Sequence, residues 1–186
     1  MQEPWPEPER VRLMSEGGPP LEIERRYLLV GRPELPEPQS VLELEQGWLP
    51  GDGVRVRLRR VREGDDERYV RTRKLGSGLS RIEYEESLSK DVFERLWPGT
   101  QGCRVRKRRH RIPSGALTWE IDEYHDHALF VAEVELPSED TVAPIPTWLS
   151  PYVEREVTLD PRYTSLQLAL RGVPDRSSDD QTSGAE

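Results

Sequence analysis

Charged residues that alternate along a predicted strand are the first feature of this sequence that could do chemistry. In the stretch 21–30 (LEIERRYLLV), a period of two places Glu22, Glu24 and Arg26 on one face. Burying these charges unpaired in an apolar core would cost several kcal/mol each. The pattern therefore fits either a solvent-exposed strand face or a strand that faces a wet, charged cavity.

The same kind of face recurs along the chain. Six further predicted strand faces carry charge: Arg55/Arg57/Arg59, Arg71/Arg73, Arg81/Glu83/Glu85, Lys107/Arg109, Glu120/Asp122 and Glu133/Glu135. A hydrophilic surface of a two-layer fold could show this pattern. The repetition of both signs on strand after strand instead favours a cavity lined by basic and acidic groups together.

Such a lining suits a ligand with dense negative charge. Arginine and lysine side chains from several strands bind a chain of phosphates well. Carboxylates in the same cavity would repel that ligand unless a divalent cation lay between them, and carboxylate oxygens are ligands that Mg²⁺ and Mn²⁺ prefer. The combination indicates phosphoryl or nucleotidyl chemistry.

The elements that must position these residues are mostly strands. Alternating segments bounded by Gly/Pro-rich turns predict strands at 21–30, 40–49, 54–61, 67–75, 80–88, 103–112, 116–124 and 129–136, with a closing segment through Glu156. Helices are predicted at 89–97, with Ser89 as N-cap, and at 162–170. About eight strands with short turns predict an α+β, mainly β fold: a closed antiparallel barrel, or tunnel, with a few flanking helices.

Length and composition bound the class of protein. The 186 residues suit one domain, and 33% charged against 34% apolar residues is what a charged interior would produce. A net charge of -8 argues against nonspecific binding to nucleic acid or anionic membranes. The single cysteine, Cys103, excludes an internal disulfide and fits a reducing compartment.

The ends of the chain differ from its middle. Pro- and Gly-rich residues 1–20 predict a disordered leader, residues 21–172 the folded domain, and residues 173–186 a disordered tail. No apolar run approaches the ~20 residues of a membrane span, and no signal-peptide pattern is evident. We expect a cytoplasmic protein, a monomer or homodimer.

The ordered set of motifs resembles the CYTH domain, or triphosphate tunnel metalloenzyme, superfamily. Its first-strand pattern Glu-x-Glu-x-Lys is matched by Glu22, Glu24 and Arg26. The resemblance continues through Gln46-Gly47-Trp48, Val54-Arg55-Val56-Arg57, Ser80-Arg81-Ile82-Glu83-Tyr84-Glu85, Lys107-Arg108-Arg109, Trp119-Glu120-Ile121-Asp122, Ala132-Glu133-Val134-Glu135-Leu136 and Glu156-Val157-Thr158 with Asp160. It implies an eight-stranded tunnel that binds a triphosphate with Mg²⁺ or Mn²⁺.

The resemblance also implies a role for each matching position. The metal-binding residues would be Glu22, Glu24, Glu120, Asp122, Glu133 and Glu135. The substrate-binding residues would be Arg26, Arg55, Arg57, Arg73, Arg81, Lys107 and Arg109. The catalytic residues would be Glu22, Glu24, Glu83, Glu85 and Lys107.

Three positions depart from the family pattern. Arg26 replaces the first-strand lysine, and Arg73 is taken as the replacement for the lysine of a Thr-x-Lys strand. Arginine keeps the charge but is bulkier, so it is not an equivalent replacement. Trp48 stands where short bacterial relatives have tyrosine, and it supplies no phenol hydroxyl.

The function predicted from the resemblance is metal-dependent hydrolysis of inorganic triphosphate to pyrophosphate and phosphate. One set of alternatives keeps the fold and adds an organic group: thiamine triphosphate hydrolysis, nucleoside triphosphate hydrolysis, or conversion of ATP to cyclic AMP. Another alternative is a module that binds polyphosphate or nucleotide without catalysis, which the arginine replacements and the missing tyrosine motivate.

Overall fold

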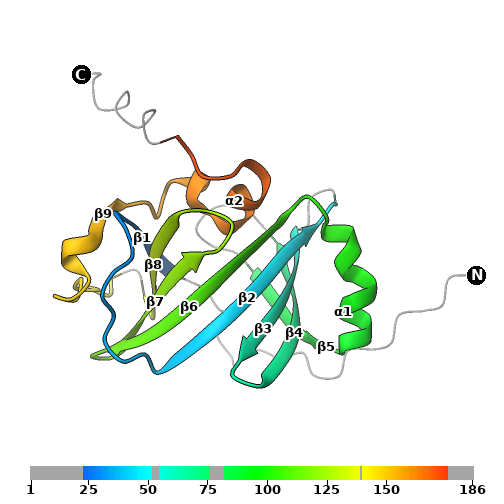
Figure 1. Ribbon diagram of the computed structural model, residues 1–186, viewed down its shortest axis with the longest axis horizontal. Helices are drawn as coiled ribbons and strands as arrows, with labels where there is room; N and C mark the ends of the chain where they lie inside the picture. The colour runs from blue at the N-terminus through cyan, green and yellow to red at the C-terminus, as the bar shows by residue number, and fades with distance from the viewer. Residues whose placement is uncertain (1–22, 52–54, 76–81, 139, 176–186) are drawn as a thin grey trace, which may run out of the picture.

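The computed structural model describes residues 23–51, 55–75, 82–138 and 140–175. The predicted leader at 1–20, most of the predicted tail, and two predicted site residues, Glu22 and Arg81, lie outside the described residues. Within them, one antiparallel sheet and two α-helices make up a mainly β, α+β fold (Figure 1). The fold class predicted from the strand pattern is confirmed at this level.

The sheet contains nine strands. They are β1 (Ile23–Leu29), β2 (Ser40–Leu49), β3 (Arg55–Glu63), β4 (Asp66–Leu75), β5 (Ile82–Leu88), β6 (Arg104–Ser114), β7 (Leu117–Tyr124), β8 (Leu129–Leu136) and β9 (Val153–Glu156). Their order is β5-β4-β3-β2-β6-β7-β8-β1-β9, and every neighbouring pair is antiparallel. The short β9 forms within the predicted closing segment.

The edges of the sheet are β5 and β9. No hydrogen-bonded pairing joins these two edges among the strands that the structure describes. The sheet twists strongly, with β2 and β6 running across its middle (Figure 1). The expected closure into a barrel is therefore not confirmed, although all eight expected strands are present.

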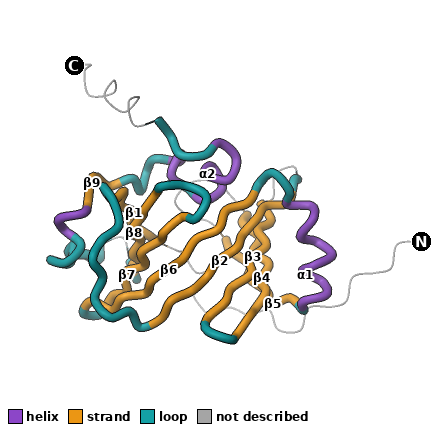
Figure 2. The backbone as a smooth tube through the Cα atoms, viewed as in Figure 1, coloured by secondary structure: helices purple, strands orange, loops and turns teal. Residues whose placement is uncertain are grey.

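The helices begin where capping side chains meet free backbone N–H groups. α1 (Lys90–Leu96) begins after Ser89, whose hydroxyl accepts a hydrogen bond from the Val92 amide at 3.3 Å. α2 (Ser165–Arg171) begins after Thr164, later than predicted, because a 3₁₀ turn at Pro161–Tyr163 comes first. Figure 2 shows the two helices on different parts of the sheet. Each has seven residues, too few to cross a bilayer.

The two faces of the sheet bury different residues. Alternation places Tyr27, Trp119 and Ile121 on one face, here called the outer face, where they pack with Leu149 in an apolar core. On the same side, Phe93 of α1 packs against strands β3 and β4. The opposite face carries Arg26, Arg109, Glu120, Asp122 and Glu133 and is called the charged face. An apolar cluster closes one end of it, where Tyr163 and Leu168 of the C-terminal segment pack.

Candidate active site

Strand register brings predicted site residues from four strands onto the charged face. Directly opposite residues in an antiparallel ladder share a face. Arg26 on β1 lies opposite Glu133 on β8, which in turn lies opposite Glu120 on β7. Arg109 on β6 lies opposite Asp122 on β7. Residues far apart in the sequence therefore converge because the sheet places β6, β7, β8 and β1 side by side.

Arg26 links two strands through its guanidinium. Its Nε donates to Oε1 of Glu133 at 2.8 Å, and its Nη2 donates to Oε1 of Glu24 at 2.5 Å. Its backbone N–H donates to the hydroxyl of Thr158 at 3.0 Å, which ties β1 to the segment that follows β9. The side chain is buried. Arg26 therefore stands in the family's lysine position as a bridge between two carboxylates.

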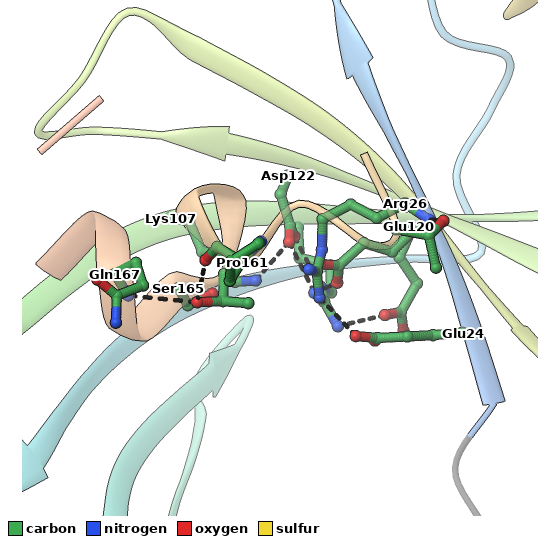
Figure 3. Close-up of polar contacts among 12 residues, drawn as sticks. Glu24, Arg26, Lys107, Glu120, Asp122, Pro161, Ser165 and Gln167 are labelled. Atoms are coloured by element: carbon green, nitrogen blue, oxygen red, sulfur yellow. Dashed lines mark hydrogen bonds and ion pairs between the residues drawn. The ribbon is translucent and has the colours of Figure 1, made fainter. Parts of the chain in front are cut away.

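Arg109 holds three carboxylates at once. Its Nε and Nη2 donate to the two oxygens of Asp122 at 2.6 and 2.7 Å, a bidentate pair. Nη2 also donates to Glu133 at 2.5 Å, and Nη1 donates to Glu120. Lys107 adds an ion pair with the fully buried Asp122 (Figure 3). Three cations and four carboxylates thus form one connected network, made of Glu24, Arg26, Lys107, Arg109, Glu120, Asp122 and Glu133.

Burial and pairing shift the ionisation of this network. Burial alone would raise the pKa of Glu133, but Lys107, Arg109 and Arg26 outweigh it and hold that pKa well below its usual range. Burial, together with the charge of Arg109, lowers the pKa of Lys107 despite its pairing with Asp122. The carboxylate of Glu133 is therefore ionised at neutral pH.

Tyr124 borders the network and was not predicted as a site residue. Its ring centroid lies 5.4 Å from Nζ of Lys107, and its hydroxyl lies 3.0 Å from Oγ of Ser165 on α2. Burial raises the pKa of this phenol. Tyr124 lies on the same face of β7 as Glu120 and Asp122, because the three residues are spaced by two along the strand. Strand alternation could therefore have identified it as a site residue.

Two further predicted residues reach the charged face from β3 and β5. Arg57 lies opposite Thr72 on β4, which lies opposite Glu85 on β5. Nη2 of Arg57 donates to the Thr72 hydroxyl at 3.1 Å, and that hydroxyl donates to Oε2 of Glu85 at 3.4 Å. Thr72 is fully buried and connects the two, although it was not predicted as a site residue.

Arg73 does not join this group. Because Thr72 points to the charged face, its neighbours Arg71 and Arg73 point to the outer face. There, Arg73 Nη2 donates to Oε1 of Glu86 at 3.2 Å, and Arg71 Nε donates to the same oxygen at 2.6 Å. The Thr-x-Lys pattern is met instead by Thr72-Arg73-Lys74, and the register pairs position 74 with Arg55.

For the remaining predicted residues, Arg55, Glu83 and Glu135, the structure gives mainly a position on a strand. For Arg55 and Glu83 the structure describes the backbone, which pairs both positions with Lys74. Glu135 is exposed and lies directly opposite Glu24. Beside Glu120 and Glu135, a cleft of about 640 Å³ opens between the 114–118 turn and residues 136–144.

The donor chemistry of the charged face fits a divalent cation, although the present arrangement does not form a ready site. Among the described residues, no three acidic, histidine or cysteine side chains gather as a metal site. The carboxylates are turned toward Arg26, Lys107 and Arg109 instead. However, Glu24 lies opposite Glu135 and Glu120 opposite Glu133, and like charges in these positions repel each other. Oxygen donors of this kind suit Mg²⁺ or Mn²⁺.

Comparison with known proteins identifies relatives along most of the chain. No family model matches it. An inorganic triphosphatase from Nitrosomonas europaea is 40% identical over 156 residues, which is 80% of this chain and 97% of that protein. An inorganic triphosphatase from Acetivibrio thermocellus is 31% identical over 153 residues, covering 79% and 92%.

A solved structure supports the same assignment. The crystal structure of an inorganic triphosphatase superimposes with a TM-score of 0.59 at 34% identity, covering 85% of this chain and all of that one. The similarity includes the strands that carry the charged face, because it spans nearly the whole length of each relative. The chain therefore belongs to the family of these inorganic triphosphatases, within the CYTH, or triphosphate tunnel metalloenzyme, superfamily that its motifs resemble.

Proposed function

We propose that this protein is a divalent-metal-dependent triphosphatase that hydrolyses inorganic triphosphate to pyrophosphate and phosphate. The observation that carries the proposal is the convergence of cations and carboxylates from β1, β6, β7 and β8 on one face of the sheet. The curated relatives named inorganic triphosphatase support the choice of substrate.

The cations of the charged face would bind the phosphate oxygens. Arg26, Lys107 and Arg109 are the candidates in the network, and Arg57 is the candidate on β3. Arginine can hold two oxygens of a phosphate in its planar fork, and the same geometry is visible in the bidentate pair of Arg109 with Asp122. Arg55 and Arg81 remain predicted members of this set.

The carboxylates would hold Mg²⁺ or Mn²⁺. Glu24, Glu133 and Glu135 are the first candidates, together with the predicted Glu22, and Glu120 and Asp122 are the supporting ones. A bound divalent cation would neutralise charge on the phosphate oxygens and stabilise the charge that develops during phosphoryl transfer. Glu85, which accepts a hydrogen bond from Thr72, is the described candidate for holding a proton of the attacking water.

Ligand binding requires the ion pairs of the network to exchange partners. In the structure, Arg26 and Arg109 contact carboxylates. When these guanidiniums bind phosphate oxygens, the carboxylates become available to a divalent cation. The sheet would close into a tunnel, so that Arg57 on β3 and Arg109 on β6 could contact one ligand from different strands.

The single cysteine supports a reducing, cytoplasmic location.

The test is phosphate release from tripolyphosphate with Mg²⁺ and Mn²⁺ varied, using wild type, Glu24→Gln and Arg62→Met. Arg62 lies on β3 but is exposed and pairs with Glu67, so it serves as the matched control. We expect turnover by wild type and Arg62→Met in the presence of metal, and strongly reduced turnover by Glu24→Gln. Absence of wild-type turnover with either metal would overturn the proposal and favour a module that only binds polyphosphate.

The cleft beside Glu120 and Glu135 supports one second candidate. Its walls include Leu117, Leu136 and Val142 beside Glu120, an apolar surface that could accept an organic group carried by the triphosphate. Thiamine triphosphate and ATP should then compete with tripolyphosphate and be turned over faster. Formation of cyclic AMP from ATP would identify a cyclase.

A further inference from the structure

Arg59 is a cation on the charged face to which the family resemblance gives no role. It lies on β3, two residues beyond Arg57, opposite Gln46 on β2 and Val70 on β4. Because residues two apart in a strand share a face, Arg59 lies on the same face of the sheet as Arg57. Its side chain is partly exposed, yet its Nε is buried and has no hydrogen-bond partner among the described residues.

The surroundings of Arg59 do not neutralise it. Arg26, Lys107 and Arg109 each form ion pairs with carboxylates, whereas Arg59 forms none with the described residues. Among the charged neighbours of Arg59, the cations Arg57 and Arg109 affect its pKa most, while Glu85 and Glu120 act more weakly. Burial, followed by the charges of Arg57 and Arg109, lowers the pKa of Arg59 to about 9. It therefore remains a cation at neutral pH.

Strand β2 supplies no carboxylate to the face of the sheet that carries Arg59. Between β3 and β6, the charged face of β2 presents Leu42 and Leu44, which pack with Val61. The glutamates of β2 point to the outer face, where Glu43 pairs with Arg108 and Glu45 pairs with Arg60. Arg57, Arg59 and Arg109 thus stand around an apolar floor that supplies no negative charge.

A partly buried cation loses hydration and here gains no ion pair with the described residues in return, so an anionic ligand at this position would stabilise the protein. We propose that Arg59 is a further substrate-binding residue, which together with Arg57 and Arg109 forms an anion subsite for one phosphoryl group of the triphosphate. This inference rests on the proposed function. The subsite accepts phosphate oxygens because three guanidiniums converge there and no carboxylate from β2 competes with the ligand.

The experiment compares Arg59→Met, Arg59→Lys and the control Arg62→Met, with tripolyphosphate as the probe and EDTA present to prevent hydrolysis. Thermal unfolding gives Tm with and without tripolyphosphate, and calorimetry gives its Kd. For Arg59→Met we expect a higher Tm without ligand, a smaller rise on adding tripolyphosphate, and a Kd at least ~10-fold larger. Arg59→Lys should retain part of the affinity, and Arg62→Met should resemble wild type.

A structural role for Arg59 predicts the opposite pattern. If Arg59→Met lowers the Tm of the ligand-free protein and leaves the Kd unchanged, the inference is overturned. Should Arg59→Met fail to fold, the Kd of Arg59→Lys decides, since an unchanged value contradicts the subsite. Binding and hydrolysis are measured separately. A wild type that binds tripolyphosphate without hydrolysing it contradicts the proposed function, whereas loss of that binding in Arg59→Met still supports the subsite.

Discussion

On β1, β6, β7 and β8 each described cation of the charged face is paired with a carboxylate, whereas Arg59 on β3 forms no ion pair with the described residues. The first region, here called the paired half, contains the network around Arg26 and Arg109. The second, the arginine half, contains Arg57 and Arg59 beside Thr72. The two regions share one sheet face but balance their charge differently.

The difference indicates which ligand each half needs. The paired half is neutralised from within, and under the proposed function its carboxylates would exchange partners to accept a metal ion. In the arginine half, Arg59 forms no ion pair with the described residues, and an anion would supply that partner. A complex of triphosphate with a divalent cation satisfies both halves at once, because it supplies anionic oxygens and a cation together.

The largest stability effect should come from the paired half. Arg109→Met leaves Asp122, Glu133 and Glu120 without their shared guanidinium, and removing one partner of a buried ionic group costs about 3–5 kcal/mol. We expect the free energy of unfolding in urea at pH 7 to fall by that amount. The same substitution at Arg59 should have the opposite sign. Equal losses for the two variants would contradict the distinction between the halves.

A second, smaller effect should appear as a pH dependence. The pKa of Glu133 is lowered in the folded protein, so between that pKa and about 4.5 the unfolded chain binds more protons. The stabilisation by Glu133 is therefore complete above pH 4.5 and is lost as the pH falls through the folded pKa. In urea unfolding below pH 4.5, Glu133→Gln should show a shallower loss of stability than wild type. Glu34→Gln, an exposed loop variant, should keep the wild-type slope.

The smallest effect is expected away from the charged face. Asp126 accepts hydrogen bonds from Arg106 Nη2 at 2.6 Å and from the Arg106 backbone N–H at 3.1 Å. This pair is largely exposed, and such ion pairs contribute at most about 1 kcal/mol. Asp126→Asn should therefore lower the free energy of unfolding by less than that, and added salt should reduce the difference. If Asp126→Asn lowered the free energy of unfolding as much as Arg109→Met, burial would not explain the difference between the buried and the exposed ion pairs.

The strands and their charged faces could be predicted from the sequence because side chains alternate with a period of two. Glu120 and Asp122 lie on one face of β7, as their spacing of two residues predicts, and β8 has the predicted bounds. The sequence could not say which face of each strand meets the others, because that depends on long-range register. Arg73 shows the consequence: its charge was predictable, but its position on the outer face required the pairing of β4 with β3.

The charge pattern of the sequence also could not predict the roles of neutral residues or the order of the strands in the sheet. Thr72 and Thr158 hold charged residues in place through hydroxyl groups, and a charge pattern does not single out a hydroxyl. The placement of β2 between β3 and β6 is likewise a property of the whole sheet. That placement creates the apolar floor beside Arg59, which is why the arginine half is visible only in three dimensions.

We propose that the carboxylates of the paired half hold a metal ion, while the cations of both halves bind the triphosphate. The most direct measurement is steady-state release of phosphate from tripolyphosphate by Glu24→Gln and Arg57→Met, with Mn²⁺ and substrate varied independently. We predict that Glu24→Gln raises the Mn²⁺ concentration needed for half-maximal rate, whereas Arg57→Met raises the KM for tripolyphosphate. The same parameter shifting in both variants, or hydrolysis by wild type that continues in EDTA, would contradict the account.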